Sequence, residues 1–294
     1  MSKYGKRWYT DMKISLKKPE GVTAEYLTIS FEMKQIRLLV IRPASDGRKE
    51  CRPGVLWIHG GGYMLGMPEM AYMSRAADLA AKGGAVVVSP AYTLSFAAPY
   101  PRALLECHAV LVYMKEHASE LGIRSDQIMV GGESAGGGLA AALCMYAKDM
   151  NTVRIAFQMP LYPMIDCFDT ETSRRNNGKV WNTGRNHFAW KLYLRSLKGI
   201  QDIPEYASPS RRKDYSGLPP CYTFVGDIEP FYAETEAYVK NLQDAGTEAQ
   251  LDVYRGFYHA YEMLNPDDPR SVRAADRFLE VFREACRKYT AVNL

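Results

Sequence analysis

The sequence lacks the patterns that metal sites and disulfide frameworks require. Its six cysteines are never closer than 23 residues, no Cys-x-x-Cys occurs, and its five histidines are not paired. Zinc sites need such ligands at short spacings, so we expect no metal. We interpret the cysteines as reduced, mostly packing thiols, which favours a cytoplasmic protein.

Long hydrophobic runs are also missing. The longest apolar stretches, such as 55–58 and 85–88, have the length of a strand and fall far below the ~18 residues of a membrane span. The start of the chain is basic, but no apolar core follows it, so it does not resemble a secretory signal. We therefore expect no membrane span and no export signal.

Charge is mixed rather than concentrated in one sign. The chain has 37 Lys and Arg against 33 Asp and Glu, a net charge of +4, with basic residues in short pairs such as Arg174 and Arg175. A nucleic-acid surface needs a denser basic stripe, so we expect no nucleic-acid partner. With 294 residues, 47% of them hydrophobic, the chain can bury a core of its own.

What is present is an alternation of segments with strand and helix patterns. The alternation predicts an α/β fold whose mostly parallel sheet is covered by helices on both faces. The first two or three strands, around 25–58, follow one another without a helix, which predicts antiparallel pairing at one edge. The expected strands are 36–41, 54–58, 85–89, 127–131, 153–159, 220–225 and 250–254, and the expected helices are 69–82, 101–120, 135–149, 231–245 and 270–288.

A serine stands between a predicted strand and a predicted helix, in the motif Gly132-Glu133-Ser134-Ala135-Gly136. Small residues around a serine at this position are typical of a nucleophile elbow, a tight turn that lifts the hydroxyl above the sheet. A dinucleotide-binding loop is the competing interpretation. Its glycine pattern would begin at Gly136, several residues past the strand, and no Walker motif occurs, so we disfavour nucleotide binding.

A glycine run follows the predicted strand 55–58, in His59-Gly60-Gly61-Gly62. Consecutive glycines let backbone N–H groups point into one space, as an oxyanion hole requires. We predict the N–H groups of Gly61, Gly62 and Ala135 as its donors. We interpret His59 as a brace for this loop rather than as a base.

A serine nucleophile needs a histidine base, and that base needs an acid. Among the five histidines, His259 follows the last predicted strand on a loop led by a glycine, which gives the chain order serine, acid, histidine. The acid is expected just past the strand around 220–225, where Asp227 and Glu229 both stand. Residue spacing alone leaves these two carboxylates open.

Taken together, these motifs resemble the hormone-sensitive-lipase-like family of α/β-hydrolases, the bacterial family IV carboxylesterases. The resemblance covers roughly residues 35–285, and it departs from the family at Glu133, where Asp is usual, and in a lost Ala-Pro-Glu. It is carried by His-Gly-Gly-Gly at 59–62, Gly-Glu-Ser-Ala-Gly-Gly at 132–137, the segment 92–103, Leu218-Pro219-Pro220 and Gly256-x-x-His259.

The resemblance implies an α/β-hydrolase fold with a mostly parallel eight-stranded sheet and a small helical lid. It implies one domain over 1–294, with the lid built from about 1–35 and 164–207, the second part matching a long stretch without a predicted strand. Aromatic residues of both parts would line or roof the acyl pocket: Trp8, Tyr9, Trp181, Phe188, Trp190 and Tyr193.

The resemblance also bears on the acid. When the family's Asp-Pro-Leu-x-Asp-Glu run is laid without gaps from Leu218, its catalytic Asp falls on Glu229. We therefore prefer Glu229 to Asp227, because a glutamate can also hold the imidazole if its loop adjusts.

The resulting hypothesis is a serine carboxylesterase for short-chain acyl esters, with Ser134, His259 and Glu229 as triad and no cofactor. Its expected partner is a small-molecule ester, and a homodimer is left open. One alternative is a binding protein on the same fold without catalysis. The other is an acyl hydrolase for amides, formamides or acetylated sugars, because the same oxyanion geometry serves all of them.

Overall fold

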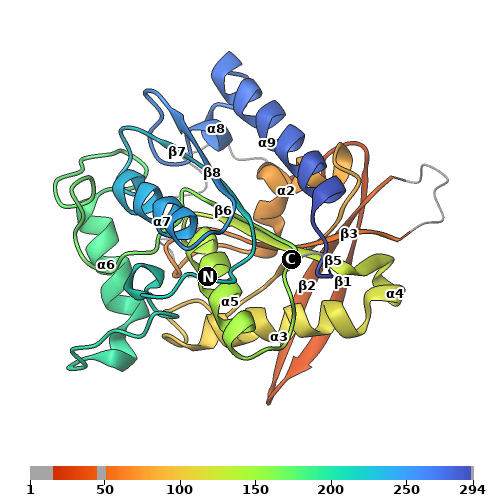
Figure 1. Ribbon diagram of the computed structural model, residues 1–294, viewed down its shortest axis with the longest axis horizontal. Helices are drawn as coiled ribbons and strands as arrows, with labels where there is room; N and C mark the ends of the chain where they lie inside the picture. Colours follow the sequence, from red (N-terminus) through yellow and green to blue (C-terminus); the bar gives the residue numbers. More distant parts are fainter. Residues whose placement is uncertain (1–15, 45–50, 293–294) are drawn as a thin grey trace.

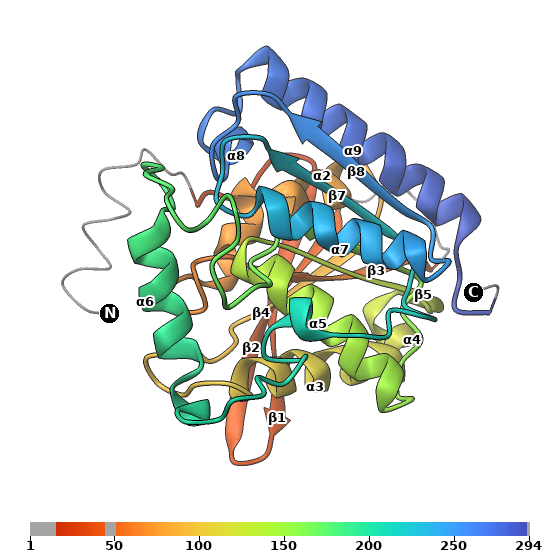
Figure 2. The same ribbon diagram turned by 60° about the vertical axis from the view of Figure 1, so that its left-hand side comes forward.

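The computed structural model describes residues 16–44 and 51–292. In this part of the chain, eight strands form one sheet in the order β1-β2-β4-β3-β5-β6-β7-β8, seen from two sides in Figures 1 and 2. The strands are β1 (Val22–Phe31), β2 (Lys34–Pro43), β3 (Arg52–Ile58), β4 (Val86–Pro90), β5 (Ile123–Glu133), β6 (Phe157–Leu161), β7 (Cys221–Gly226) and β8 (Ala249–Tyr254).

The sheet is antiparallel at one edge and parallel elsewhere. β1 pairs with β2 and β2 with β4 in antiparallel register, whereas every pair from β4 to β8 is parallel. The predicted antiparallel edge is right for β1 and β2 but wrong for β3. That strand lies between β4 and β5, and residues 54–58 are all buried, which suits a strand with a neighbour on each side.

Helices cover both faces of the sheet, as predicted (Figure 1). Leu38 and Val40 of β2 pack with residues of α3 and α5 in one core cluster, and Leu39 and Ile41 pack with residues of α2 and α9 in another. Alternate residues of a strand point to opposite faces, so each buried strand supplies both layers. The helices are η1 (Pro68–Met73), α2 (Arg75–Ala81), α3 (Arg102–Glu116), α4 (Ala118–Leu121), α5 (Ala135–Asp149), α6 (Thr183–Tyr193), η2 (Arg195–Leu197), η3 (Pro209–Arg211), α7 (Tyr232–Asp244), α8 (Tyr261–Leu264) and α9 (Pro269–Lys288).

Between β6 and β7 the chain leaves the sheet and forms α6. This helix stands apart from the helices that cover the sheet (Figure 2). Trp190 and Tyr193 of α6 are buried, and the Tyr193 ring stacks on that of Tyr63 with centroids 4.0 Å apart. The lid in two parts stays a prediction. Residues from Val22 to Phe31 form β1, whereas Trp8 and Tyr9 lie outside the described residues.

None of the helices in the described ranges has the length and apolarity needed to cross a membrane.

Candidate active site

Ser134 occupies the sharp turn between β5 and α5. Its backbone angles, φ 57° and ψ −121°, lie where side chains are strained. The Ser134 N–H donates to the Leu161 carbonyl at 3.0 Å, and the Ser134 carbonyl accepts from the Met164 N–H at 3.0 Å. A Cβ atom at position 136 would lie 2.0 Å from the Ile58 carbonyl oxygen, so only glycine fits there. The flanking glycines of the motif thus let the turn pack directly against β3.

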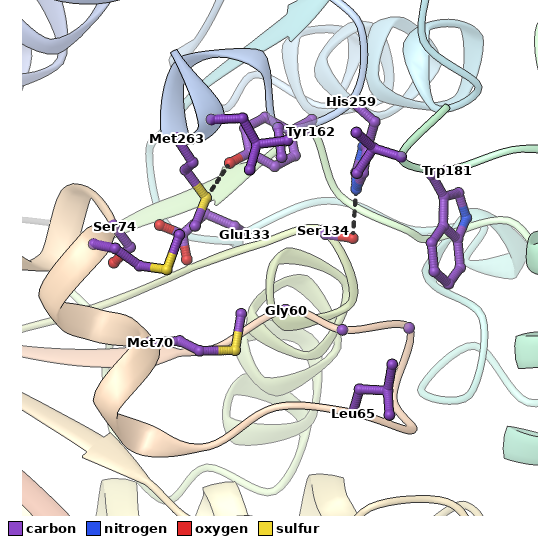
Figure 3. Close-up of a pocket in the computed structure, with 16 residues that line it drawn as sticks. Gly60, Leu65, Met70, Ser74, Glu133, Ser134, Tyr162, Trp181, His259 and Met263 are labelled. Atoms are coloured by element: carbon purple, nitrogen blue, oxygen red, sulfur yellow. Dashed lines mark hydrogen bonds between the residues drawn. The ribbon is translucent and has the colours of Figure 1, made fainter. Parts of the chain in front are cut away.

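His259 and Glu229 complete a hydrogen-bonded row with this serine. The Ser134 hydroxyl donates to His259 Nε2 across 2.9 Å, and His259 Nδ1 donates to Glu229 Oε2 across 2.5 Å. Figure 3 shows the first of these bonds. All three side chains are buried, with 6%, 5% and 2% of the residue exposed for Ser134, His259 and Glu229. The loops after β5, β7 and β8 therefore bring a hydroxyl, an imidazole and a carboxylate into line.

The other candidate acid, Asp227, faces a different partner. Its Oδ1 accepts a hydrogen bond from the Gly256 N–H at 2.7 Å, which ties the loop after β7 to the loop after β8. Glu229 additionally accepts from the Gly226 N–H at 3.3 Å. The structure thus places Glu229, and not Asp227, against the imidazole.

The glycine loop after β3 lies beside Ser134. Gly61 and Gly62 have φ angles of +112° and +61°, and a Cβ on Gly62 would lie 2.3 Å from the Trp181 ring. Among the residues that the structure describes, no group accepts a hydrogen bond from the backbone N–H of Gly61, Gly62 or Ala135. These three N–H groups thus have no hydrogen-bond acceptor among the described residues.

His59, the residue just before the glycines, links this loop to Tyr92. Its ring stacks on Tyr92 with centroids 4.3 Å apart, and its Nδ1 donates to the Gly60 carbonyl at 2.8 Å. Burial lowers the pKa of His59 to about 4. The imidazole is thus neutral at physiological pH and acts as a brace, as the sequence analysis interprets it.

A cavity of about 130 Å³ opens in front of Ser134 (Figure 3). Apart from the candidate catalytic and oxyanion residues, its walls are mainly apolar. They are formed by Leu65, Met70, Met73, Ser74, Glu133, Tyr162, Val180, Trp181, Ala260, Met263 and Leu264.

The predicted lid aromatics separate into three groups. Trp181 lines the cavity. Trp190 and Tyr193 are buried against Tyr63 instead, behind the glycine loop. Phe188 is 52% exposed and does not line the cavity. A helix presents different side chains to different sides, which composition alone cannot assign.

Glu133 is a buried carboxyl next to Ser134, and its side chain makes contacts with two other elements. Its Oε2 accepts from the Trp57 indole N–H at 2.8 Å, and its Oε1 accepts from the Arg75 backbone N–H at 3.3 Å. Burial raises the pKa of Glu133 to about 8, and the nearby Glu262 adds to the rise. Glu133 therefore connects the nucleophile turn to β3 and to the start of α2.

Two further residues near the site escaped the sequence analysis. The Tyr162 hydroxyl donates to Glu262 Oε1 at 2.7 Å, and the Tyr162 ring meets that of His259 edge to face at 5.3 Å. Their positions carry a signal, since Tyr162 directly follows β6 and Glu262 follows His259 by three residues. Tyr162 lies at the carboxyl end of a parallel strand, and Glu262 lies in α8, the short helix that follows His259.

The buried Glu133 carboxyl predicts a pH-dependent stability difference. Glu133 ionises above pH 4.5 in the unfolded chain but only near pH 8 in the folded one, so unfolding releases a proton between these values. The free energy of unfolding of the wild type should therefore fall, relative to Glu133→Gln, as the pH rises from about 4.5 to about 8. The expected change is on the order of a few kcal/mol. Urea unfolding of both proteins at several pH values measures it, and parallel pH curves would contradict it.

No group of three or more histidine, cysteine, aspartate or glutamate side chains in residues 16–44 and 51–292 is arranged to hold a metal ion.

Comparison with known proteins finds a hydrolase fold family and several esterases that are similar to this chain. A family model described as alpha/beta hydrolase fold matches residues 55–263. Carboxylesterase NlhH of Mycobacterium tuberculosis is 28% identical over 79% of this chain and 74% of that protein. An arylesterase of Saccharolobus solfataricus is 28% identical over 83% of this chain and 78% of that protein.

Solved structures of esterases share the fold. A structure titled Bacterial Heroin Esterase superimposes with a TM-score of 0.88 at 29% identity, covering 96% of this chain and 90% of that one. A thermostable esterase from Pseudomonas putida has a TM-score of 0.84 at 29% identity, covering 96% of this chain and 88% of that one.

Proposed function

Because this chain belongs to the alpha/beta hydrolase fold family, in its hormone-sensitive-lipase-like group, and is a carboxylic ester hydrolase, we propose that it cleaves short-chain acyl esters with Ser134 as its nucleophile. The observation that carries this proposal is the hydrogen-bonded row of Ser134, His259 and Glu229 beside the glycine loop. The predicted cytoplasmic location stays a prediction.

In the first half of the reaction, Ser134 Oγ attacks the ester carbonyl carbon while its proton passes to His259 Nε2. The carbonyl oxygen becomes an oxyanion, which accepts hydrogen bonds from the N–H groups of Gly61, Gly62 and Ala135. Glu229 holds the imidazole through Nδ1 and stabilises its positive charge. His259 then gives the proton to the leaving alkoxide, and the alcohol departs from an acyl-serine.

In the second half, a water molecule loses a proton to His259 Nε2 and attacks the acyl-serine carbonyl. The same N–H groups hold the second oxyanion. His259 returns the proton to Ser134 Oγ as the acid leaves, which restores the resting site. No step requires a cofactor.

The proposal is tested with p-nitrophenyl acetate and butyrate together with a serine-directed fluorophosphonate probe. We expect turnover of both esters and labelling of Ser134, located by mass spectrometry of the digested protein. Absence of both turnover and labelling would instead favour a binding protein.

The cavity also predicts chain-length selectivity. Each buried methylene contributes about 0.8 kcal/mol, but only if the chain fits. With about 130 Å³ in front of Ser134, kcat/KM should be highest for acyl chains of about two to six carbons. The p-nitrophenyl laurate ester should have a kcat/KM at least tenfold below that of the butyrate. A higher kcat/KM for the laurate would show that the cavity opens onto a long groove.

A further inference from the structure

Three methionines line the cavity, two on one side and one on the other. Met70 and Met73 come from η1, a 3-10 helix in which residues three apart lie on the same side, and Met263 comes from α8. Figure 3 shows Met70 and Met263 on opposite sides of the space beside Ser134. Thioether side chains from two separate elements thus enclose the part of the cavity next to the nucleophile.

The thioether of Met263 packs against Tyr162. Its sulfur lies 3.3 Å from the Tyr162 hydroxyl, whose single proton is donated to Glu262 Oε1 at 2.7 Å. Methionine sulfur is polarisable and interacts favourably with aromatic rings, whereas a leucine of similar volume lacks this property. A wall with several methionines therefore differs chemically from an ordinary aliphatic wall.

The volume of the cavity sets the size of the group it holds. An apolar protein cavity of about 150 Å³ is known to bind benzene. The cavity here, at about 130 Å³, has room for one six-membered ring or a short chain next to the scissile bond.

We propose that the region formed by Met70, Met73 and Met263 selects small esters that carry one aromatic ring next to the ester group, in preference to a saturated ring of the same size. This inference rests on the proposed function and names the substrate class of the same site. Hydrophobic burial by itself favours the saturated ring, which is the more water-avoiding of the two. An aromatic preference must therefore come from contacts with the ring, either from the methionine sulfurs or from Trp181 and Tyr162, and the methionine variants separate these two sources.

The test uses two matched pairs of substrates. Benzyl acetate is compared with cyclohexylmethyl acetate, and ethyl phenylacetate with ethyl cyclohexylacetate, because the esters within a pair differ little in chemical reactivity. We expect kcat/KM about tenfold higher for the aromatic member of at least one pair. The pair that shows it identifies whether the ring belongs to the alcohol or to the acyl group.

Variants connect this preference to the methionines. Met70→Leu and Met263→Leu should each lower the aromatic-to-saturated ratio, and the double variant should bring it close to one. Met150→Leu serves as the matched control, because Met150 is 55% exposed at the end of α5 and should leave the ratio unchanged. A ratio that survives in the double variant would overturn the assignment to these residues.

Two further outcomes separate this inference from the proposed function. Turnover of ethyl acetate with no aromatic preference in either pair would overturn the inference and leave the esterase intact. Absence of turnover for every ester, together with no fluorophosphonate labelling of Ser134, would overturn both.

Discussion

Ser134→Ala is expected to lower kcat for p-nitrophenyl butyrate by at least about 10⁴, because no other group can form the acyl intermediate. Some rate above that in water should remain, since the cavity and the oxyanion donors still bind the ester. The variant should fold normally, because alanine removes only the hydroxyl from a turn that glycines and backbone hydrogen bonds hold in place. Steady-state kinetics and thermal unfolding measure these two effects.

Ser216→Ala provides a matched control, because this serine is exposed on the loop before β7 and should tolerate the change. Ser134→Ala should also abolish fluorophosphonate labelling, and the control should not. If Ser134→Ala kept more than a tenth of the wild-type kcat, the nucleophile would have to be another residue.

Glu229→Gln should lower kcat by roughly 10² to 10⁴. A neutral amide cannot stabilise the imidazolium, and its NH₂ group can select the wrong tautomer of His259. Asp227→Asn should cost far less, since Asp227 binds the Gly256 N–H and not the imidazole. Comparison of the two variants in kcat, with thermal unfolding as the check on folding, tests the assignment.

The reverse result would be informative. If Asp227→Asn were the severe variant, the alignment without gaps across this loop would be wrong by two residues. Asp227 would then be the third member of the triad, and the contact between Glu229 and His259 would lack a catalytic role.

The sequence predicts the strand and helix order well, because this order depends on the pattern of apolar residues within each segment. The apolar run 54–58 predicts a strand from its own residues, and the motif around Ser134 likewise predicts a tight turn between a strand and a helix. The position of β3 within the sheet cannot be predicted in this way. A strand's neighbours depend on contacts between residues far apart in the chain, and two consecutive strands without a helix do not have to pair.

In the candidate site, too, some residues can be predicted from local sequence and others only from contacts in the folded chain. Motif and chain order propose Ser134 and His259, whereas two residues of loop leave Asp227 and Glu229 equivalent until a family motif or a structure separates them. Tyr162 and Glu262 are found only in three dimensions, because their contact joins residues on different elements. The orientation of Phe188 and Trp190 on α6 likewise depends on what the helix packs against.

The pairing of β3 with β5 sets the distance between Ser134 and the glycine loop. Ile58 lies opposite Gly132 in the parallel register, so the glycine loop and the serine turn leave the sheet at the same level. Surface residues inserted between these strands would therefore leave the separation of Ser134 from the glycine loop unchanged. A slip of one residue in that ladder, by contrast, would separate them by about 3 Å, the rise of a single strand residue.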